Sequence, residues 1–233
     1  MELIIILIIS IITIVILAII SKFNFKNIKL IKQIGEDKNL NEITNILPEN
    51  KQIAKEILKK LKNEDVKIKT GGANSQASLY IVATNSIFIA NIKNTFTRIQ
   101  TIAHECVHSV QDKTLLWFNF IFSNVYNIFW IVITILTILN KIQNTTIFAI
   151  ILIMMCIILF FVRSYLETDA MIKARFLAKE YMEEKCDIIS KENIQTIIEN
   201  YDKINCIGIK LTNLSLIVEY LIKVVIYCGV ALI

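Results

Sequence analysis

The chain of 233 residues contains only two histidines, and its five cysteines form no CxxC pair. So few histidines exclude a metal site built on three imidazoles. Two of the cysteines fall within long apolar runs, which argues against a disulfide framework and for reduced thiols. The cysteines are Cys106, Cys156, Cys186, Cys206 and Cys228.

The N-terminus also lacks the marks of a removable signal peptide. It opens with Met1-Glu2 rather than a basic segment, and no small-x-small cleavage site precedes Ser21. The apolar run over 3–20 is longer than a typical signal core. We therefore expect it to remain as a membrane anchor.

Apolar residues dominate the composition, at 55% of the chain with a mean hydropathy of +0.59. This exceeds what a soluble core of this size requires. Four apolar stretches, 3–20, 115–139, 147–162 and 211–233, each approach the roughly 20 residues that cross a bilayer as a helix. The sequence predicts a mainly α membrane protein with four transmembrane helices.

Basic residues indicate which side of the membrane the intervening segments occupy. They follow the first and third apolar stretches, which by the positive-inside rule places both following segments in the cytoplasm. Lys141 in the opposite loop does not reverse this bias. We attribute the net charge of +5 to topology and expect no nucleic-acid binding. The basic residues are Lys22, Lys26, Lys29, Lys32, Arg163, Lys173, Arg175, Lys179 and Lys185.

Both histidines belong to the segment His104-Glu105-Cys106-Val107-His108. On a helix the four-residue spacing places both imidazoles on one face, where they can bind one Zn²⁺. Glu105 can then reach a water on the metal and act as the general base. Cys106 points to the far side and is expected to pack. The alternative is a helix with two incidental histidines.

A catalytic zinc needs a third protein ligand and an open position for water. With no further histidine, that ligand must be a carboxylate or a thiolate. Glu167 is our choice because the hairpin of two spans brings the segment from Arg163 to Ala170 to the same membrane surface as the histidines. Alternatively, Glu167 is a solvated charge at a helix start.

Further residues are candidates for supporting roles. Asp169 or Gln111 is expected to orient the histidines through hydrogen bonds. Arg175, Arg163 and Tyr165 are candidates for stabilising the oxyanion. A substrate peptide could add to an exposed edge strand, for which we name Ile87, Phe88, Ile89, Ala90 and Asn91. A strand covered by its neighbours is the alternative. Glu219 and Lys223, four apart, read as a structural ion pair.

The predicted organisation has five parts. Residues 1–20 form the anchor, 21–113 a cytoplasmic zincin-like α/β subdomain, 114–162 a transmembrane hairpin, 163–210 cytoplasmic helices and 211–233 the last span. In the subdomain, an amphipathic helix opens at Pro48-Glu49 and strands are expected at 66–69, 79–83 and 87–91, with turns at Gly71-Gly72 and Thr84-Asn85. The metal helix should be capped by Asn94 or Thr95.

The order of these features resembles the YugP-like family of membrane-embedded neutral zinc metallopeptidases, and more distantly the HtpX-like proteases. The matching segments are the HECVH motif with Gln111 after it, and Glu167-Thr168-Asp169-Ala170. Val107 replaces the usual glycine, and Ser164-Tyr165-Leu166 replaces a proline-containing approach. The resemblance implies one Zn²⁺ per chain, held by His104, His108 and Glu167.

We expect an integral-membrane zinc endopeptidase that hydrolyses membrane or membrane-adjacent proteins at the cytoplasmic face. Its partners are then the lipid bilayer and a protein or peptide substrate, with the oligomeric state left open. The bias toward Ile, Asn and Lys is typical of an AT-rich genome and favours a bacterial cell membrane. The alternative is a non-catalytic, zinc-stabilised membrane scaffold. A metal inside the bilayer is disfavoured by polar residues around the motif, such as Arg98 and Gln100.

Overall fold

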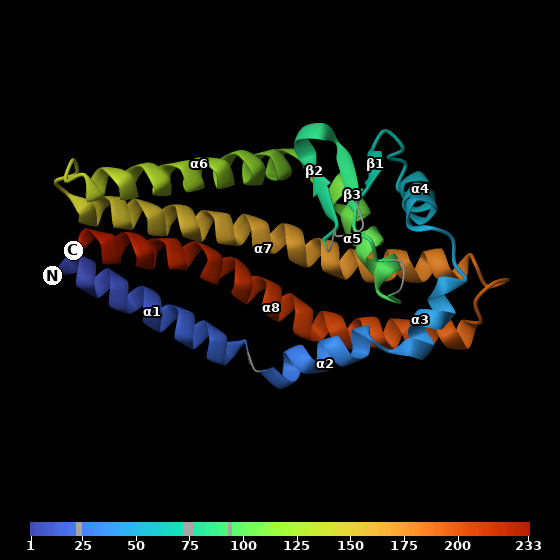
Figure 1. Ribbon diagram of the computed structural model, residues 1–233. Coiled ribbons are helices and arrows are strands. Elements are labelled where there is room, and N and C mark those ends of the chain that lie inside the picture. The colour runs from blue at the N-terminus through green and yellow to red at the C-terminus, as the bar shows by residue number, and fades with distance from the viewer. Residues whose placement is uncertain (22–24, 72–76, 93–94) are drawn as a thin grey trace. The chain divides into compact units, whose positions relative to one another are not determined.

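The computed structural model describes residues 1–21, 25–71, 77–92 and 95–233, and the protein is mainly helical with one small sheet (Figure 1). Lys22, Gly72 and Asn94, which figured in the sequence predictions, lie outside the described residues. The elements are α1 Glu2–Ile20, α2 Phe25–Gly35, α3 Lys38–Asn45, α4 Asn50–Lys60, β1 Lys67–Thr70, β2 Leu79–Ile81, the 3-10 turn η1 Val82–Thr84, β3 Ser86–Ile89, α5 Arg98–Val110, α6 Lys113–Ile138, α7 Thr145–Glu183 and α8 Lys191–Ala231.

Helices α1, α6, α7 and α8 are each long and apolar enough to cross a membrane, as the sequence predicted. Two of them are longer than expected. Helix α7 is 39 residues long and runs beyond the predicted span, past Glu167, to Glu183. Helix α8 is 41 residues long and begins well before position 211. The predicted boundaries near 162 and 210 are therefore not helix ends: no proline interrupts either helix there, and α8 continues through Gly208.

The chain divides into two compact units. Unit 1 comprises 1–23, 117–165 and 210–233, and the four long helices supply its segments (Figure 1). Tyr126, Leu152, Leu159 and Val224 are among the fully buried residues of its core. The predicted pair is present, with Lys223 Nζ 4.0 Å from a Glu219 carboxylate oxygen. Lys223 also donates a 2.7 Å hydrogen bond to Asn127.

Unit 2 comprises 24–116 and 166–209 and contains the sheet. The strand order is β1-β3-β2, with β1 parallel and β2 antiparallel to β3. Strand β3 is therefore central, and the prediction of an exposed edge over Ile87, Phe88, Ile89, Ala90 and Asn91 was wrong. Ile87 and Ile89 lie on the same face of β3 and are buried, and α5 contacts this strand.

The strands agree with the predicted order; the first keeps its predicted length but begins one residue later, and the other two are shorter than predicted. The second strand stops at Ile81, because 82–84 form a 3-10 turn that ends at Asn85 in the left-handed conformation, with φ 44° and ψ 55°. Asparagine tolerates this conformation better than most residues. The turn at Asn85 reverses the chain, so that β2 and β3 pair antiparallel, as the predicted hinge at Thr84-Asn85 requires.

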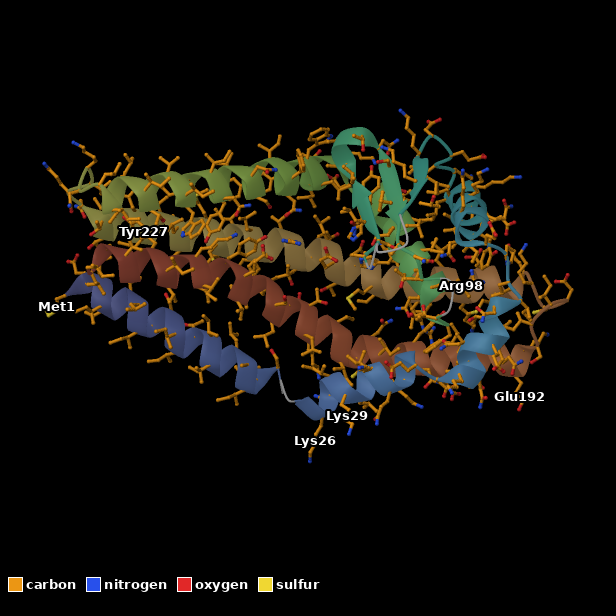
Figure 2. The ribbon with its side chains drawn as sticks, viewed as in Figure 1. Met1, Lys26, Lys29, Arg98, Glu192 and Tyr227 are labelled. Atoms are coloured by element: carbon orange, nitrogen blue, oxygen red, sulfur yellow. The ribbon has the colours of Figure 1, made fainter. Side chains whose placement is uncertain are left out.

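Helix α5 begins later than predicted. Its N-cap is Thr97, without a side-chain cap hydrogen bond, so Thr95 is not the cap. The first helical residue, Arg98, is fully buried. Its guanidinium donates hydrogen bonds of 2.8–2.9 Å to the carbonyl oxygens of Thr44, Leu47 and Pro48 and to the Asn50 side chain. Figure 2 labels Arg98 at this end of α5. Arg98 thereby fixes the start of the histidine helix against the segment that joins α3 to α4.

The buried face of α5 matches its sequence pattern with one exception. The apolar residues before and along this helix, Phe96, Ile99, Ile102, Ala103 and Val107, are buried, whereas the apolar Val110 is 43% exposed. Cys106 is buried too, and its thiol lies 3.9 Å from the Ala54 carbonyl oxygen of α4. It therefore packs between α4 and α5, as predicted. This packing holds the opposite face of α5, which bears both histidines.

Candidate metal centre

Three side chains of unit 2 converge to form a candidate metal centre. The Nε2 atoms of His104 and His108 lie 3.0 Å apart, and a Glu167 carboxylate oxygen lies 3.4 Å from the first and 3.7 Å from the second. Ligand atoms about 2.0–2.1 Å from a tetrahedral zinc are separated by about 3.3 Å. The three groups therefore match the spacing of a metal site, and together they could hold an ion.

Two helices supply these ligands. His104 and His108 are one helical turn apart on α5, and both imidazoles are only partly exposed, at 19% and 12%. Glu167 comes from α7, far along the chain, and is 26% exposed. The sequence predicted this convergence. Because both helices are regular at these residues, the ligand positions depend on helix packing rather than on a loop.

A hydrogen-bond relay fixes the ring of His108. The Gln111 amide nitrogen donates to the Leu166 carbonyl oxygen at 2.8 Å and to an Asp169 carboxylate oxygen at 2.9 Å. Its amide oxygen therefore faces Nδ1 of His108, at 2.8 Å. Since this oxygen can only accept, Nδ1 carries the proton and Nε2 presents its lone pair to the site. Gln111 thus contacts His108, and Asp169 in turn accepts a hydrogen bond from Gln111. The sequence analysis named the two residues as alternatives for orienting a histidine.

Glu105, the acidic residue of the HECVH motif, is more buried than Glu167. Glu105 is 6% exposed. Burial raises the pKa of its carboxyl group, while the neighbouring His104 and His108 and a hydrogen bond from the Tyr80 backbone act to lower it. A carboxyl group of raised pKa beside a metal suits proton transfer near neutral pH. Tyr80 lies on β2, and this strand contacts α5, a contact the sequence gave no local signal for.

Charge also acts on His108. Burial acts to lower the pKa of its imidazole, but the hydrogen bond and negative charge of Glu167, together with the charge of Glu105, raise it overall. The site thus favours positive charge between two carboxylates. A divalent cation provides that charge when bound to the same atoms.

The three oxyanion candidates are otherwise engaged or exposed. Arg175 forms two 2.8 Å hydrogen bonds with the Asp202 carboxylate of α8. Arg163 belongs to unit 1, where its guanidinium lies 3.5 Å from Glu219 and 3.2 Å from the Tyr220 hydroxyl. Tyr165, also of unit 1, is 59% exposed. None of these contacts involves the metal ligands.

Lys113 and the Tyr80 side chain are features that sequence reasoning missed. The Lys113 ammonium donates hydrogen bonds to the Tyr80 hydroxyl at 2.9 Å and to the Ser109 carbonyl oxygen at 2.7 Å. It also lies over the Tyr80 ring, 5.1 Å from its centre. These contacts join the end of α5 to β2, the strand whose backbone reaches Glu105. Lys113 stands directly before an apolar stretch in the sequence, which gives no sign of a partner in the sheet.

Comparisons of the chain with protein-family models, curated proteins and solved structures found no match. The interpretation of the centre therefore rests on its own geometry.

Removing the Gln111 relay should weaken metal binding. In the Gln111→Ala variant His108 loses the acceptor that fixes its tautomer, so we expect zinc affinity to fall about 10- to 100-fold. Competition with a chelator of known affinity, using the full-length protein in detergent, measures this. Gln100→Ala is the matched control, because Gln100 lies on the same helix but bonds Asn205, at 2.6 Å. Equal affinities in the two variants would contradict the relay.

Proposed function

We propose that this protein is an integral-membrane zinc endopeptidase with a zincin-like site on the cytoplasmic side of a bacterial cell membrane. The observation that carries the proposal is the placement of Glu105 beside three groups spaced to bind one metal ion. A structural metal site requires four protein ligands and no general base. The described arrangement instead offers three ligands and a buried carboxylate next to them.

The donor set favours zinc. Two imidazole nitrogens and one carboxylate oxygen form a known set of catalytic zinc ligands, whereas magnesium and calcium prefer oxygen ligands alone. His104, His108 and Glu167 would hold the ion. When bound, zinc lowers the pKa of a water molecule toward about 7 and polarises a peptide carbonyl group.

The chain's own residues then perform the proton transfers. Glu105 accepts a proton from the attacking water and donates it to the departing amine, first as general base and then as general acid. Gln111 and Asp169 keep His108 in the tautomer that can bind the metal ion. Their role is to position this ligand, and it requires no contact with the substrate.

The substrate is expected to bind along β2 rather than β3. Strand β2 has β3 on one side and packs against α5. The Tyr80 backbone acts on the pKa of Glu105, which supports β2, rather than the central strand, as the strand that binds the substrate. An extended peptide added there would bind through backbone hydrogen bonds, which demand little of its sequence.

The membrane location supports a membrane-associated substrate. Glu167 lies five residues beyond the apolar run 147–162 on the same continuous helix, about 7.5 Å along its axis. His108 precedes the apolar start of α6 by a similar number of residues. The proposed site therefore lies near one membrane surface, where segments of membrane proteins are available. The resemblance to YugP-like metallopeptidases supports the same function.

Metal removal tests this function. The purified full-length protein should contain about one zinc per chain and hydrolyse an unstructured peptide. A zinc chelator should abolish hydrolysis, and added zinc should restore it. Bound zinc without hydrolysis of any membrane-bound or soluble peptide would favour the scaffold alternative. Hydrolysis that persists after complete zinc removal would contradict the proposal.

A further inference from the structure

Helix α2 carries a basic face that the metal site does not explain. The helix has the sequence FKNIKLIKQIG, and its three lysines, Lys26, Lys29 and Lys32, recur every three residues and are all exposed. Figure 2 shows Lys26 and Lys29 projecting away from the ribbon. Ile31 and Ile34, on the other side, are partly buried. The helix thus packs by one face and presents positive charge on the other.

This positive charge has little compensation. No aspartate or glutamate occurs between Glu2 and Glu36. The one ion pair of the stripe joins Lys32 to Glu36 at 3.8 Å, and both side chains are more than 60% exposed. Exposed pairs of this kind are weak. The stripe therefore remains available to a negatively charged surface.

Apolar side chains border the lysines. Ile28 is 40% exposed and Leu30 is 43% exposed, although both belong to a helix outside the predicted spans. Helices that lie in a membrane interface combine lysines with exposed apolar residues, because headgroups bind the charges and the acyl boundary accepts the apolar groups. The combination on α2 fits a lipid surface better than water alone.

Chain connectivity keeps α2 close to the bilayer. Helix α1 ends at Ile20 and α2 begins at Phe25. The chain between these two residues can extend at most about 18 Å. A lysine side chain adds several ångströms of reach. This short connection limits how far Lys26, the first lysine of the stripe, can lie from the end of α1.

We propose that the α2 lysine stripe, Lys26, Lys29 and Lys32, binds anionic phospholipid headgroups of the membrane that α1 crosses. Each lysine near an anionic surface strengthens the attraction roughly fivefold. The three lysines together should therefore bind α2 more strongly to an anionic bilayer than to a neutral one. The proposal is independent of metal binding and of catalysis.

The test uses the full-length protein in nanodiscs of phosphatidylcholine alone or with about a third of phosphatidylglycerol. Hydrogen exchange of the backbone amides of 25–35 reports whether the helix is held at the surface. We expect exchange to slow about tenfold in the anionic discs, and the effect to disappear in about 1 M KCl, which screens charges beyond about 3 Å. The salt measurement needs no variant.

A charge-neutral variant assigns the effect to these lysines. Lys26→Gln/Lys29→Gln/Lys32→Gln should exchange equally fast in both discs. The matched control is Lys51→Gln/Lys55→Gln/Lys59→Gln, which removes the same charge from exposed positions on α4 and should keep the protection. Equal exchange of the unmodified protein in the two lipids would overturn the proposal, as would equal loss of protection in both variants.

Discussion

Replacing Glu105 by glutamine is expected to reduce peptide hydrolysis by about 10²- to 10⁴-fold, the contribution of a positioned general acid–base group. Glutamine keeps the shape of the side chain but cannot accept the proton of a neutral water. Because Glu105 is not among the three groups that could hold the ion, zinc content should stay at that of the unmodified protein. Parallel measurements of kcat and of bound zinc separate these two effects.

The control for this variant is Glu64→Gln, which makes the same chemical change at an exposed position. It should leave both turnover and zinc content unchanged. A Glu105→Gln protein that retains full turnover would remove Glu105 from the mechanism. Loss of zinc together with turnover would instead show that Glu105 supports the metal rather than the proton transfer.

The ligands could be predicted from the sequence because they depend on local geometry and on one topological rule. His104 and His108 needed only the spacing of a helical turn. Glu167 required the inference that two consecutive spans return the chain to the membrane surface from which it left. The structure brings Glu167 within 3.7 Å of both imidazoles.

The order of strands could not be predicted in the same way. A run such as 87–91 shows that a strand is apolar, but its position in the sheet depends on which partners the rest of the chain supplies. Here β1 and β2 take both sides of β3. Ile87 and Ile89 share one face of β3 and are buried, and α5 contacts this strand. Burial of that face shows that the sheet is covered, but it does not distinguish an edge strand from a central one.

Charged residues misled the sequence analysis for a related reason. Arg175 was one of three candidates for stabilising the oxyanion, yet it pairs with Asp202, which lies on another helix. Arg98 was taken as a sign of a wet helix, yet it is fully buried among carbonyl oxygens. The hydrogen-bond partners of Arg175 and Arg98 could not be predicted from the sequence, because they depend on how the helices pack.

Loss of the Glu167 carboxylate should have the second large effect. In Glu167→Gln the side chain keeps its size but loses the negative charge that faces both histidines, at 3.4 and 3.7 Å. Loss of a metal ligand costs more than loss of a group that merely orients one, for which 10- to 100-fold is typical. We therefore expect zinc affinity to fall by more than about 100-fold, with hydrolysis lost at limiting zinc.

Zinc analysis of purified protein and chelator competition measure this effect, and Glu167→Ala should behave alike. Glu183→Ala serves as the control, because Glu183 is an exposed glutamate at the end of the same helix, 3.6 Å from Lys179. If Glu167 were a solvated charge, both variants of Glu167 would bind zinc as Glu183→Ala does. The two histidines would then lack their third ligand, and the metal centre proposed for this protein would have to be abandoned.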